Sequence, residues 1–476
     1  MAWDNRWLSA LLTVSAAALF TPVQNARAAE RPNIIVVLID DMGWADLSCF
    51  GGKGPVTQNI DRLAAEGLSF TSFYVNSPIC SPSRTALTTG HYPARYRITS
   101  FLSNRADNER RGMAQWLDPQ APTLARFLKN AGYATGHFGK WHMGGQRDVG
   151  EAPLISEYGF DASLTNFEGL GPRVLPLLDA YDGKPARKHV LGSDSLGRGD
   201  IKFLDRSQVT AAFVERAIAF IDKAQQDKQP FYINLWPDDV HSPFFPPRGT
   251  PGAGEKRSLY HAVLDAMDEQ LGVLFDHIHQ SDRLRDNTLI LLASDNGPEP
   301  GAGSAGELRG TKGMLYEGGI RSPLIVWGPG FIAREKRGQR NDTSVLAAID
   351  LAPSLLKIAG VSAPKEVAFD GVESSDMLLG KSNANRGQPL FWRRPPDRPG
   401  PPRDRLPDLA VRDGDWKLLV DFDGSRPELY DIVKDPAETK NAAAEHPEIV
   451  ARLKQAVLLW NAALPKDAGQ AAAAPR

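Results

Sequence analysis

Acidic and amide side chains follow the ends of two predicted strands. Asp40 and Asp41 come directly after the apolar run Asn33–Ile39, and Asp295 and Asn296 follow a second apolar run. In an open parallel sheet the carboxyl ends of the strands meet at one edge, so side chains from different strands come together there. Three carboxylates and one amide form an all-oxygen ligand set, which suits Ca²⁺ or Mg²⁺ better than zinc. The sequence therefore predicts a divalent-cation site.

Each of these two pairs of polar residues also has a simpler interpretation. Asp40 and Asp41 could cap the helix that follows them, and Asp295-Asn296-Gly297 could form a turn, because Asp, Asn and Gly favour such positions. The occurrence of both pairs at equivalent strand ends favours the metal site over two separate local roles.

Basic side chains accompany the predicted cation site. Two of them follow the strand-like run Tyr133–Phe138, and a third follows the run Phe231–Trp236. A positive ring in a protein of net charge −2 suits an anionic substrate group, although any one member could instead be a solvated lysine or a structural histidine. The candidates are Arg84, Lys140, His142, His241 and Lys312.

A cysteine lies near the start of a short predicted helix that ends at Gly90. In the run Cys80-Ser81-Pro82-Ser83-Arg84, the helix dipole and the free N–H groups favour an anion near Cys80. Arg84 lies one turn further on, close enough to hold that anion. This arrangement predicts a thiolate nucleophile of lowered pKa. The alternative is a disulfide with Cys49, the other cysteine of the sequence.

The segment around Cys80 resembles the type I sulfatases of the alkaline phosphatase superfamily, and arylsulfatase A in particular. Their hallmark is Cys-x-Pro-Ser-Arg in a longer stretch that ends Thr-Gly-x-Tyr-Pro-x-Arg, and Cys80–Arg84 and Thr89–Arg95 match it. Further motifs of the family occur in order over nearly the whole chain. They are Asp40–Gly43, Gly139–His142, His241–Phe244, Ser294–Gly297, Gly310–Gly313, Glu317–Arg321 and Leu429–Asp431.

The resemblance implies that Cys80 is oxidised by a formylglycine-generating maturation enzyme to formylglycine (3-oxoalanine). The hydrated aldehyde would be the nucleophile, and a disulfide would then be excluded. It further implies one Ca²⁺ per subunit, held with an oxygen of the modified Cys80. The other ligands would be Asp40, Asp41, Asp295 and Asn296.

The resemblance also implies a role for each basic residue. Arg84 would orient the hydrated aldehyde, and Asp295 would help to deprotonate its attacking hydroxyl. His142 would deprotonate the remaining hydroxyl so that sulfate is released. The sulfuryl oxygens would be bound by Lys140, His241 and Lys312, of which His241 or Lys312 would protonate the leaving alcohol.

One polar position of the family, a Ser or Asn after the lysine-histidine motif, stays unassigned, with Asn166 and Glu168 as candidates. The implied function is hydrolysis of sulfate esters of a sulfated glycan or small aryl molecule. Two alternatives are a phosphate- or phosphonate-ester hydrolase of the same superfamily and a catalytically silent protein that binds sulfated glycan. A second metal cluster would favour the phosphate- or phosphonate-ester hydrolase, and the sequence shows none. Loss of Cys80 or Arg84 would favour the silent binding protein, and both residues are present.

The predicted fold class is α/β: a large mixed, mostly parallel sheet sandwiched by helices, with a smaller C-terminal antiparallel α+β subdomain. The expected divisions are a signal peptide (1–28), a catalytic α/β domain (29–365), the C-terminal subdomain (366–464) and a disordered tail (465–476). A late helix is predicted over Ser344–Ala359.

Composition limits the partners and the location. With 476 residues, 42% hydrophobic and 24% charged, the chain is long enough for a large core and is not disordered in bulk. The near-neutral charge gives no field to attract nucleic acid. The apolar run Leu8–Phe20 before Ala28 predicts a cleaved signal peptide, with an uncleaved anchor as the alternative. Cleavage would give a periplasmic or secreted protein without stable membrane insertion.

A proline-rich basic segment, Phe391–Pro407, is a candidate for substrate contact. Such a loop could bind a sulfated or uronic-acid polysaccharide, or it could be a solvated linker between the two domains. Its basic residues are Arg393, Arg394, Arg398, Arg403 and Arg405.

Overall fold

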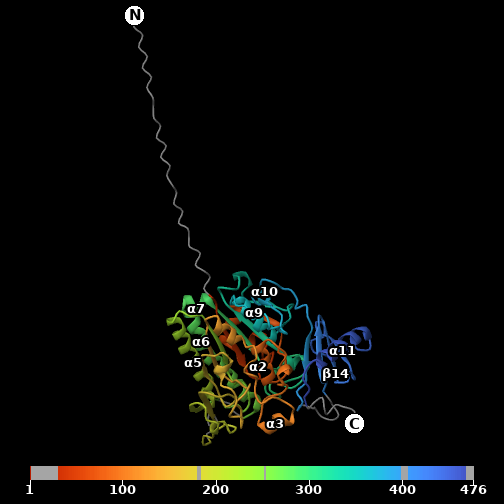
Figure 1. The fold of residues 1–476 in the computed structure, drawn as a ribbon, viewed down its shortest axis with the longest axis horizontal. Helices are drawn as coiled ribbons and strands as arrows, with labels where there is room; N and C mark the ends of the chain where they lie inside the picture. The colour runs from red at the N-terminus through yellow and green to blue at the C-terminus, as the bar shows by residue number, and fades with distance from the viewer. Residues whose placement is uncertain (2–30, 179–183, 251–253, 398–405, 468–476) are drawn as a thin grey trace. The chain divides into compact units, whose positions relative to one another are not determined.

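The computed structural model describes Met1 and residues 31–178, 184–250, 254–397 and 406–467. The chain divides into the units Met1–Glu30 and Arg31–Arg476, and the second unit holds the elements drawn in Figure 1. The strands of its largest sheet are β1 (Asn33–Ile39), β2 (Leu68–Tyr74), β3 (Ala134–Gly139), β4 (Ala162–Leu164), β7 (Phe231–Trp236), β8 (Thr288–Ser294), β9 (Arg321–Trp327), β10 (Gln339–Asn341) and β11 (Leu346–Ala347).

These strands run in the order β10-β2-β9-β8-β1-β7-β3-β4, with β11 paired beside β2. β1 pairs in parallel with β8 and β7, and β3 continues the parallel set, whereas β9 is antiparallel to both β8 and β2. The predicted large, mostly parallel sheet is therefore confirmed. A separate parallel pair is formed by β5 (Arg173–Leu177) and β6 (Ile201–Asp205).

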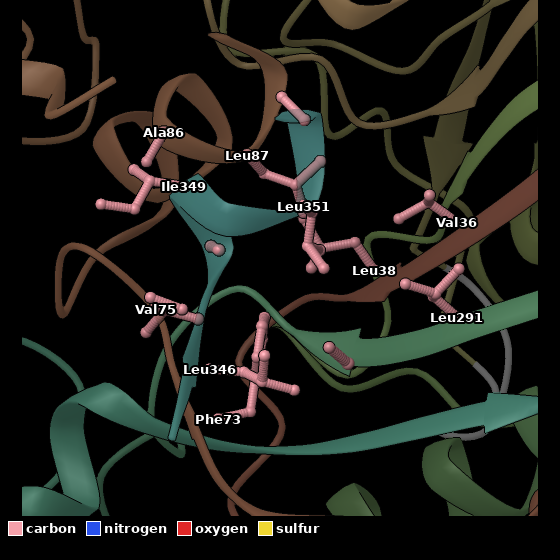
Figure 2. Close-up of a cluster of buried hydrophobic side chains, with 14 of the residues drawn as sticks. Val36, Leu38, Phe73, Val75, Ala86, Leu87, Leu291, Leu346, Ile349 and Leu351 are labelled. Atoms are coloured by element: carbon pink, nitrogen blue, oxygen red, sulfur yellow. The ribbon is translucent and has the colours of Figure 1, made fainter. Parts of the chain in front are cut away.

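Helices cover both faces of the sheet. Alternate residues of a strand point to opposite faces, so Val36 and Leu38 of β1 join one buried cluster while Val37 and Ile39 join another. Burial on both sides explains why β1 is apolar throughout. Figure 2 shows part of the first cluster. Its face is covered by α2 (Cys80–Thr89), α4 (Leu124–Asn130) and α9 (Ala348–Ile358), and the other by α1 (Gln58–Glu66), α5 (Val209–Gln226) and α6 (Lys256–Gln280).

The remaining short helices lie at turns and edges. They are α3 (Arg105–Arg110), α7 (Asp282–Asn287), α8 (Glu317–Ile320) and α10 (Ser375–Leu378). No helix of the described residues is both long and apolar enough to cross a membrane.

A smaller sheet of four antiparallel strands follows, as predicted for the C-terminal subdomain. One of its faces, including Leu409 and Leu418, packs with Leu453 of the last helix, while Trp392 and Leu419 face the core of the large sheet. The indole N–H of Trp392 donates to the Val75 carbonyl at 2.7 Å. The elements are β12 (Leu390–Arg393), β13 (Leu409–Asp413), β14 (Trp416–Val420), β15 (Glu428–Asp431) and α11 (Pro447–Ala462).

The predicted helix over Ser344–Ala359 is wrong in its first turn. Leu346 and Ala347 form β11 and pair in parallel with Phe73 and Tyr74. The helix begins only at Ala348, where the Asp350 carboxylate accepts a hydrogen bond from the Ala347 N–H at 2.8 Å. Pairing with an available strand edge outweighs local helix propensity at these residues.

Several expectations lie outside the described residues and stay predictions. They concern most of the signal peptide (1–28), most of the tail (465–476), and the residues Arg398, Arg403 and Arg405.

A buried ion-pair network joins the C-terminal sheet to the large one. Lys417 of β14 lies 2.9 Å from carboxylate oxygens of both Glu317 and Glu438, and all three side chains are buried. The Tyr74 hydroxyl on β2 donates to Glu317 at 2.6 Å and accepts from Arg412 of β13. Because each charge has a partner, the network can be buried without an isolated ion.

Removing Lys417 tests this network. We expect Lys417→Met to lower the free energy of unfolding by about 3–5 kcal/mol, because it leaves two carboxylates buried without their cation. The matched control is Lys434→Met, since Lys434 is exposed and its ion pair with Asp431 is screened by solvent, so this variant should lose much less stability. Urea denaturation of both variants measures the difference, and equal losses would contradict the network's role.

Candidate functional site

The four central strands deliver the predicted site residues to one edge of the sheet. Asp40 and Asp41 follow β1, and Asp295 and Asn296 follow the adjacent β8. On the other side of β1, His241 follows β7, and Lys140 and His142 follow β3. Neighbouring parallel strands thus bring together residues that are distant in the chain, such as Asp40 and Asn296, which lie 256 positions apart.

Gly139 lets strands β3 and β7 approach closely at this edge. Its φ is +124°, and a Cβ there would lie 1.9 Å from the Trp236 carbonyl oxygen. Any other residue would push apart the strand ends that carry Lys140 and His241.

The acidic residues form a buried cluster with unsatisfied oxygens. One ligand atom each of Asp40, Cys80 and Asp295 lies within 4.8 Å of the other two, and the same holds for Asp41, Cys80 and His241. The Asn296 amide N–H donates to Asp41 at 2.8 Å, which leaves its own oxygen facing no donor.

These observations fit a bound metal ion. Among the described residues the buried Asn296 Oδ1 has no hydrogen-bond donor, and neither has Asp40 Oδ1, although Arg84 Nη2 forms an ion pair with it at 3.3 Å. An unsatisfied buried oxygen is costly unless something binds it. Burial and the charge of Asp40, opposed by Arg84, raise the pKa of Asp295 to about 7. Crowded oxygens of this kind suit a hard divalent cation. The residues that would hold it are Asp40, Asp41, Asp295, Asn296 and a group at position 80.

Three cations neutralise the acidic cluster. Arg84 is fully buried and donates to Asp295 Oδ2 from Nε at 3.0 Å and from Nη2 at 2.7 Å. Lys140 Nζ donates to Asp40 at 2.7 Å, and Lys312 Nζ donates to Asp41 at 2.5 Å. Although burial raises the pKa of Asp40, Lys140 and Arg84 outweigh it and hold that pKa well below its usual range.

Cys80 is the first residue of α2, so it lies at the start of this helix as the sequence predicts. Its thiol is buried, and burial raises its pKa well above the ordinary value, against the attraction of Lys140 and Lys312. The expectation of a low-pKa thiolate at this helix terminus is therefore wrong: desolvation outweighs the helix dipole. Cys49 and Cys80 are both free, so the structure contains no disulfide between them.

Glu168, one of the two candidates for the position left unassigned, contacts two residues of the site. Glu168 Oε2 lies 3.0 Å from His142 Nδ1 and 3.1 Å from Lys140 Nζ. The other ring nitrogen of His142, Nε2, lies 2.9 Å from the Leu102 carbonyl oxygen, and the Leu102 N–H donates to Ser81 beside the cysteine. Asn166, the other candidate, is buried without a hydrogen-bond partner for its side chain.

The functional groups open into a cavity of about 310 Å³. Cys80, His142, His241 and Lys312 line it together with Glu168, whereas Arg84 and the acidic cluster lie behind this wall. No motif of the sequence predicts the remaining wall, because its residues come from loops without a recognisable spacing. These residues include Phe101, Arg147, Phe167, His189, Leu191 and Glu299.

The basic segment Phe391–Pro407 is partly structural. Arg393 donates from Nε to Asn461 of α11 at 2.8 Å, and Arg394 pairs with Asp408 beside β13. Both arginines are buried, so the expectation that they contact a polysaccharide is wrong for these two. Asp397 of the same segment accepts a hydrogen bond from Ser100 at 2.6 Å, next to the cavity residue Phe101.

Comparison with known families agrees with this geometry. The family model described as Sulfatase matches residues 32–361, and the model described as N-sulphoglucosamine sulphohydrolase, C-terminal, matches residues 310–462. The first match contains every strand end that carries a predicted site residue, and the second contains the C-terminal sheet.

Individual proteins resemble the chain over most of its length. Arylsulfatase A from Homo sapiens is 30% identical over 474 residues, covering 90% of this chain and 88% of its own. N-acetylgalactosamine-6-O-sulfatase from Bacteroides thetaiotaomicron is 28% identical over 507 residues, covering 90% and 93%. The crystal structure of Ps i-CgsB in complex with k-i-k-neocarrahexaose has a TM-score of 0.71 at 26% identity, covering 89% and 91%.

Binding of a divalent cation can be measured without any assay of activity. We expect Ca²⁺ or Mg²⁺ at a hundredfold excess over its Kd to stabilise the folded protein by about 2.7 kcal/mol relative to EDTA, because the ligands come together only on folding. Thermal unfolding measures this gain. Asp41→Asn should abolish most of it, and Asp431→Asn, on β15 of the C-terminal sheet, should not. The same gain in both variants would contradict the assignment of the site.

Proposed function

The chain belongs to the sulfatase family and is a sulfuric ester hydrolase, and from this premise we propose that it acts through a formylglycine made from Cys80 and one bound Ca²⁺. The observation that carries the proposal is the position of Cys80. It opens α2 at the wall of the cavity, with carboxylates behind it and with Lys312 and His241 beside it.

Several features support modification of Cys80 over direct use of its thiol. The raised pKa leaves the unmodified thiol protonated and a poor nucleophile. A hydrated aldehyde offers two hydroxyl groups, one for attack and one for release. The surrounding motif, Cys80–Arg84, resembles the one that the maturation enzyme acts on in this family.

The proposed first step is an in-line displacement at sulfur. One hydroxyl of the hydrated aldehyde gives its proton to Asp295 and attacks the sulfur atom, while the bond from sulfur to the ester oxygen breaks. Lys140, His241 and Lys312 bind the sulfuryl oxygens, and His241 or Lys312 donates a proton to the leaving alcohol. When bound, Ca²⁺ supplies positive charge that holds the nucleophile and the sulfate ester together.

The second step releases sulfate. His142 takes the proton of the remaining hydroxyl, the carbon–oxygen double bond re-forms, and the bond from this carbon to the sulfate oxygen breaks. Burial and the charge of Lys140 lower the pKa of His142 well below its ordinary value, so its ring is neutral. A neutral imidazole can take the proton, and Glu168 beside Nδ1 orients the ring.

We propose a sulfated carbohydrate as the substrate, in the periplasm or outside the cell. One relative is named an N-acetylgalactosamine-6-O-sulfatase, and the crystal structure of Ps i-CgsB is in complex with k-i-k-neocarrahexaose. The apolar leader before Ala28 supports secretion. The two groups of candidate metal ligands among the described residues share Cys80 and form one site, which favours sulfate over phosphate esters.

Mass spectrometry of the tryptic peptide Leu63–Arg84 from protein purified from its own organism tests the proposal. We expect residue 80 to be formylglycine. Cys80→Ala should lower sulfate release from 4-nitrophenyl sulfate at least about 1,000-fold, because the variant lacks the nucleophile. Cys49→Ala is the matched control and should keep wild-type activity. An unmodified thiol in active protein would overturn the proposal.

The role of His142 predicts a trapped intermediate. In His142→Ala the second hydroxyl loses its base, so we expect the sulfated form of residue 80 to accumulate and kcat to fall about 100-fold. Rapid quenching after mixing with 4-nitrophenyl sulfate, followed by mass spectrometry, measures the sulfated peptide. Lys312→Ala should slow formation instead and show no accumulation. If neither variant accumulates the sulfated peptide, His142 does not serve the release step.

A further inference from the structure

One cation in the cavity wall has no role in the proposed reaction. Arg147 lines the same cavity as Cys80 and Lys312, from the loop that follows β3. Its backbone lies in the left-handed region with φ of +53°, which is uncommon for a residue other than glycine. The preceding residue, Gln146, forms a bridge with Glu168, which fixes this loop beside His142.

Arg147 differs from the other cations of the site in having no acidic partner. Lys312 is paired with Asp41, and Lys140 is paired with Asp40 and Glu168. Among the described residues, Arg147 makes no ion pair or hydrogen bond through its side chain, and its Nε is buried without a partner.

The nearby acidic groups are already engaged. The carboxylate of Asp148, next in the chain, accepts a hydrogen bond from the Arg105 N–H at 2.8 Å. Glu299, across the same cavity, pairs with Lys256 at 3.0 Å. The charge of Arg147 is therefore left for a ligand, because a partly desolvated guanidinium gains most from an anion that accepts two of its N–H groups.

Most of the cavity wall around Arg147 is apolar or aromatic. Phe101, Phe167 and Leu191 line the cavity, and the ring of His189 meets that of Phe167 edge to face with centroids 5.3 Å apart. Such surfaces pack against the carbon-bound hydrogens of a ring and leave orientation to the few polar groups. The wall thus combines an apolar surface with a single unpaired cation.

We infer that Arg147 binds a second anionic group of the substrate, so that the preferred substrate is a sulfated sugar carrying another sulfate or a carboxylate. The inference rests on the proposed sulfatase function and concerns its specificity. Both anions present two oxygens to a guanidinium, so the arginine alone does not distinguish them. The scissile sulfate binds at a separate place, because in the proposed reaction its oxygens are bound by Lys140, His241 and Lys312.

Four substrates test this inference by kcat/KM. They are 4-nitrophenyl sulfate, N-acetylgalactosamine 6-sulfate, N-acetylgalactosamine 4,6-disulfate, and a disaccharide in which the 6-sulfated sugar is linked to a uronate. We expect the wild-type protein to prefer a substrate with two anions. Arg147→Gln should lower kcat/KM for that substrate about 10- to 100-fold, the value of a charge-assisted contact, and change the two singly charged substrates less than about threefold.

Two further variants control for folding and for charge. Arg147→Lys should recover part of the loss, because it restores the charge but not the paired N–H groups. Arg110→Gln removes an exposed arginine of α3 that pairs only locally with Asp107, and should change none of the four rates. Thermal unfolding of every variant confirms that it is folded.

The outcomes separate the two proposals. Loss confined to the disulfated sugar identifies a second sulfate as the bound group, and loss confined to the disaccharide identifies the carboxylate. Equal losses on all four substrates, or a wild-type protein that does not prefer either doubly charged sugar, would overturn the role of Arg147 while hydrolysis of 4-nitrophenyl sulfate still stands. If wild-type protein hydrolyses none of the four substrates, the proposed function itself is wrong.

Discussion

Neutralisation of buried charge at the strand ends is the constraint on which the rest of the site depends. Asp40, Asp295 and Arg84 have no exposed surface, and no one of them could be buried alone without a large loss of stability. They are tolerated because Arg84 bridges both carboxylates while its Nη1 donates to the Lys140 carbonyl at 2.9 Å. Helix α2, which carries Arg84, is thereby fixed against β1, β8 and the end of β3.

This arrangement also determines where the reactive residue lies. Arg84 and Cys80 are separated by one helical turn, so anchoring the arginine behind the wall places residue 80 at the cavity. The ionic interactions that stabilise this part of the fold therefore also orient residue 80, the proposed nucleophile. A change that weakened the pairing of Arg84 with Asp295 would be expected to affect folding, metal binding and reaction together.

The sequence predicted those parts of the structure that a local pattern encodes. The run Asn33–Ile39 is apolar throughout because it is buried on both faces, and the polar residues after it fall at the edge of the sheet for the same reason. Glu168 and Arg147 lie in loops, where no periodicity indicates which side chain reaches the cavity. The prediction for Arg393 is wrong because a run of arginines and prolines resembles a solvated loop, whereas contacts with Asn461 bury this arginine.

Glu168 places a carboxylate beside His142, which a serine or asparagine would not do. The Leu102 carbonyl can only accept a hydrogen bond, so His142 Nε2 carries a hydrogen and, in a neutral ring, Nδ1 holds a lone pair. Glu168 Oε2 lies 3.0 Å from Nδ1, neither atom makes a hydrogen bond to a described residue, and Lys140 Nζ lies 3.1 Å from the same oxygen. Burial and the charge of Lys140 lower the pKa of His142 and keep its ring neutral, so in the proposed reaction Nδ1 can take the proton that is removed when sulfate is released. The neighbouring carboxylate would then stabilise the imidazolium that forms. The release step would thus depend on a residue that the motifs of the sequence do not include.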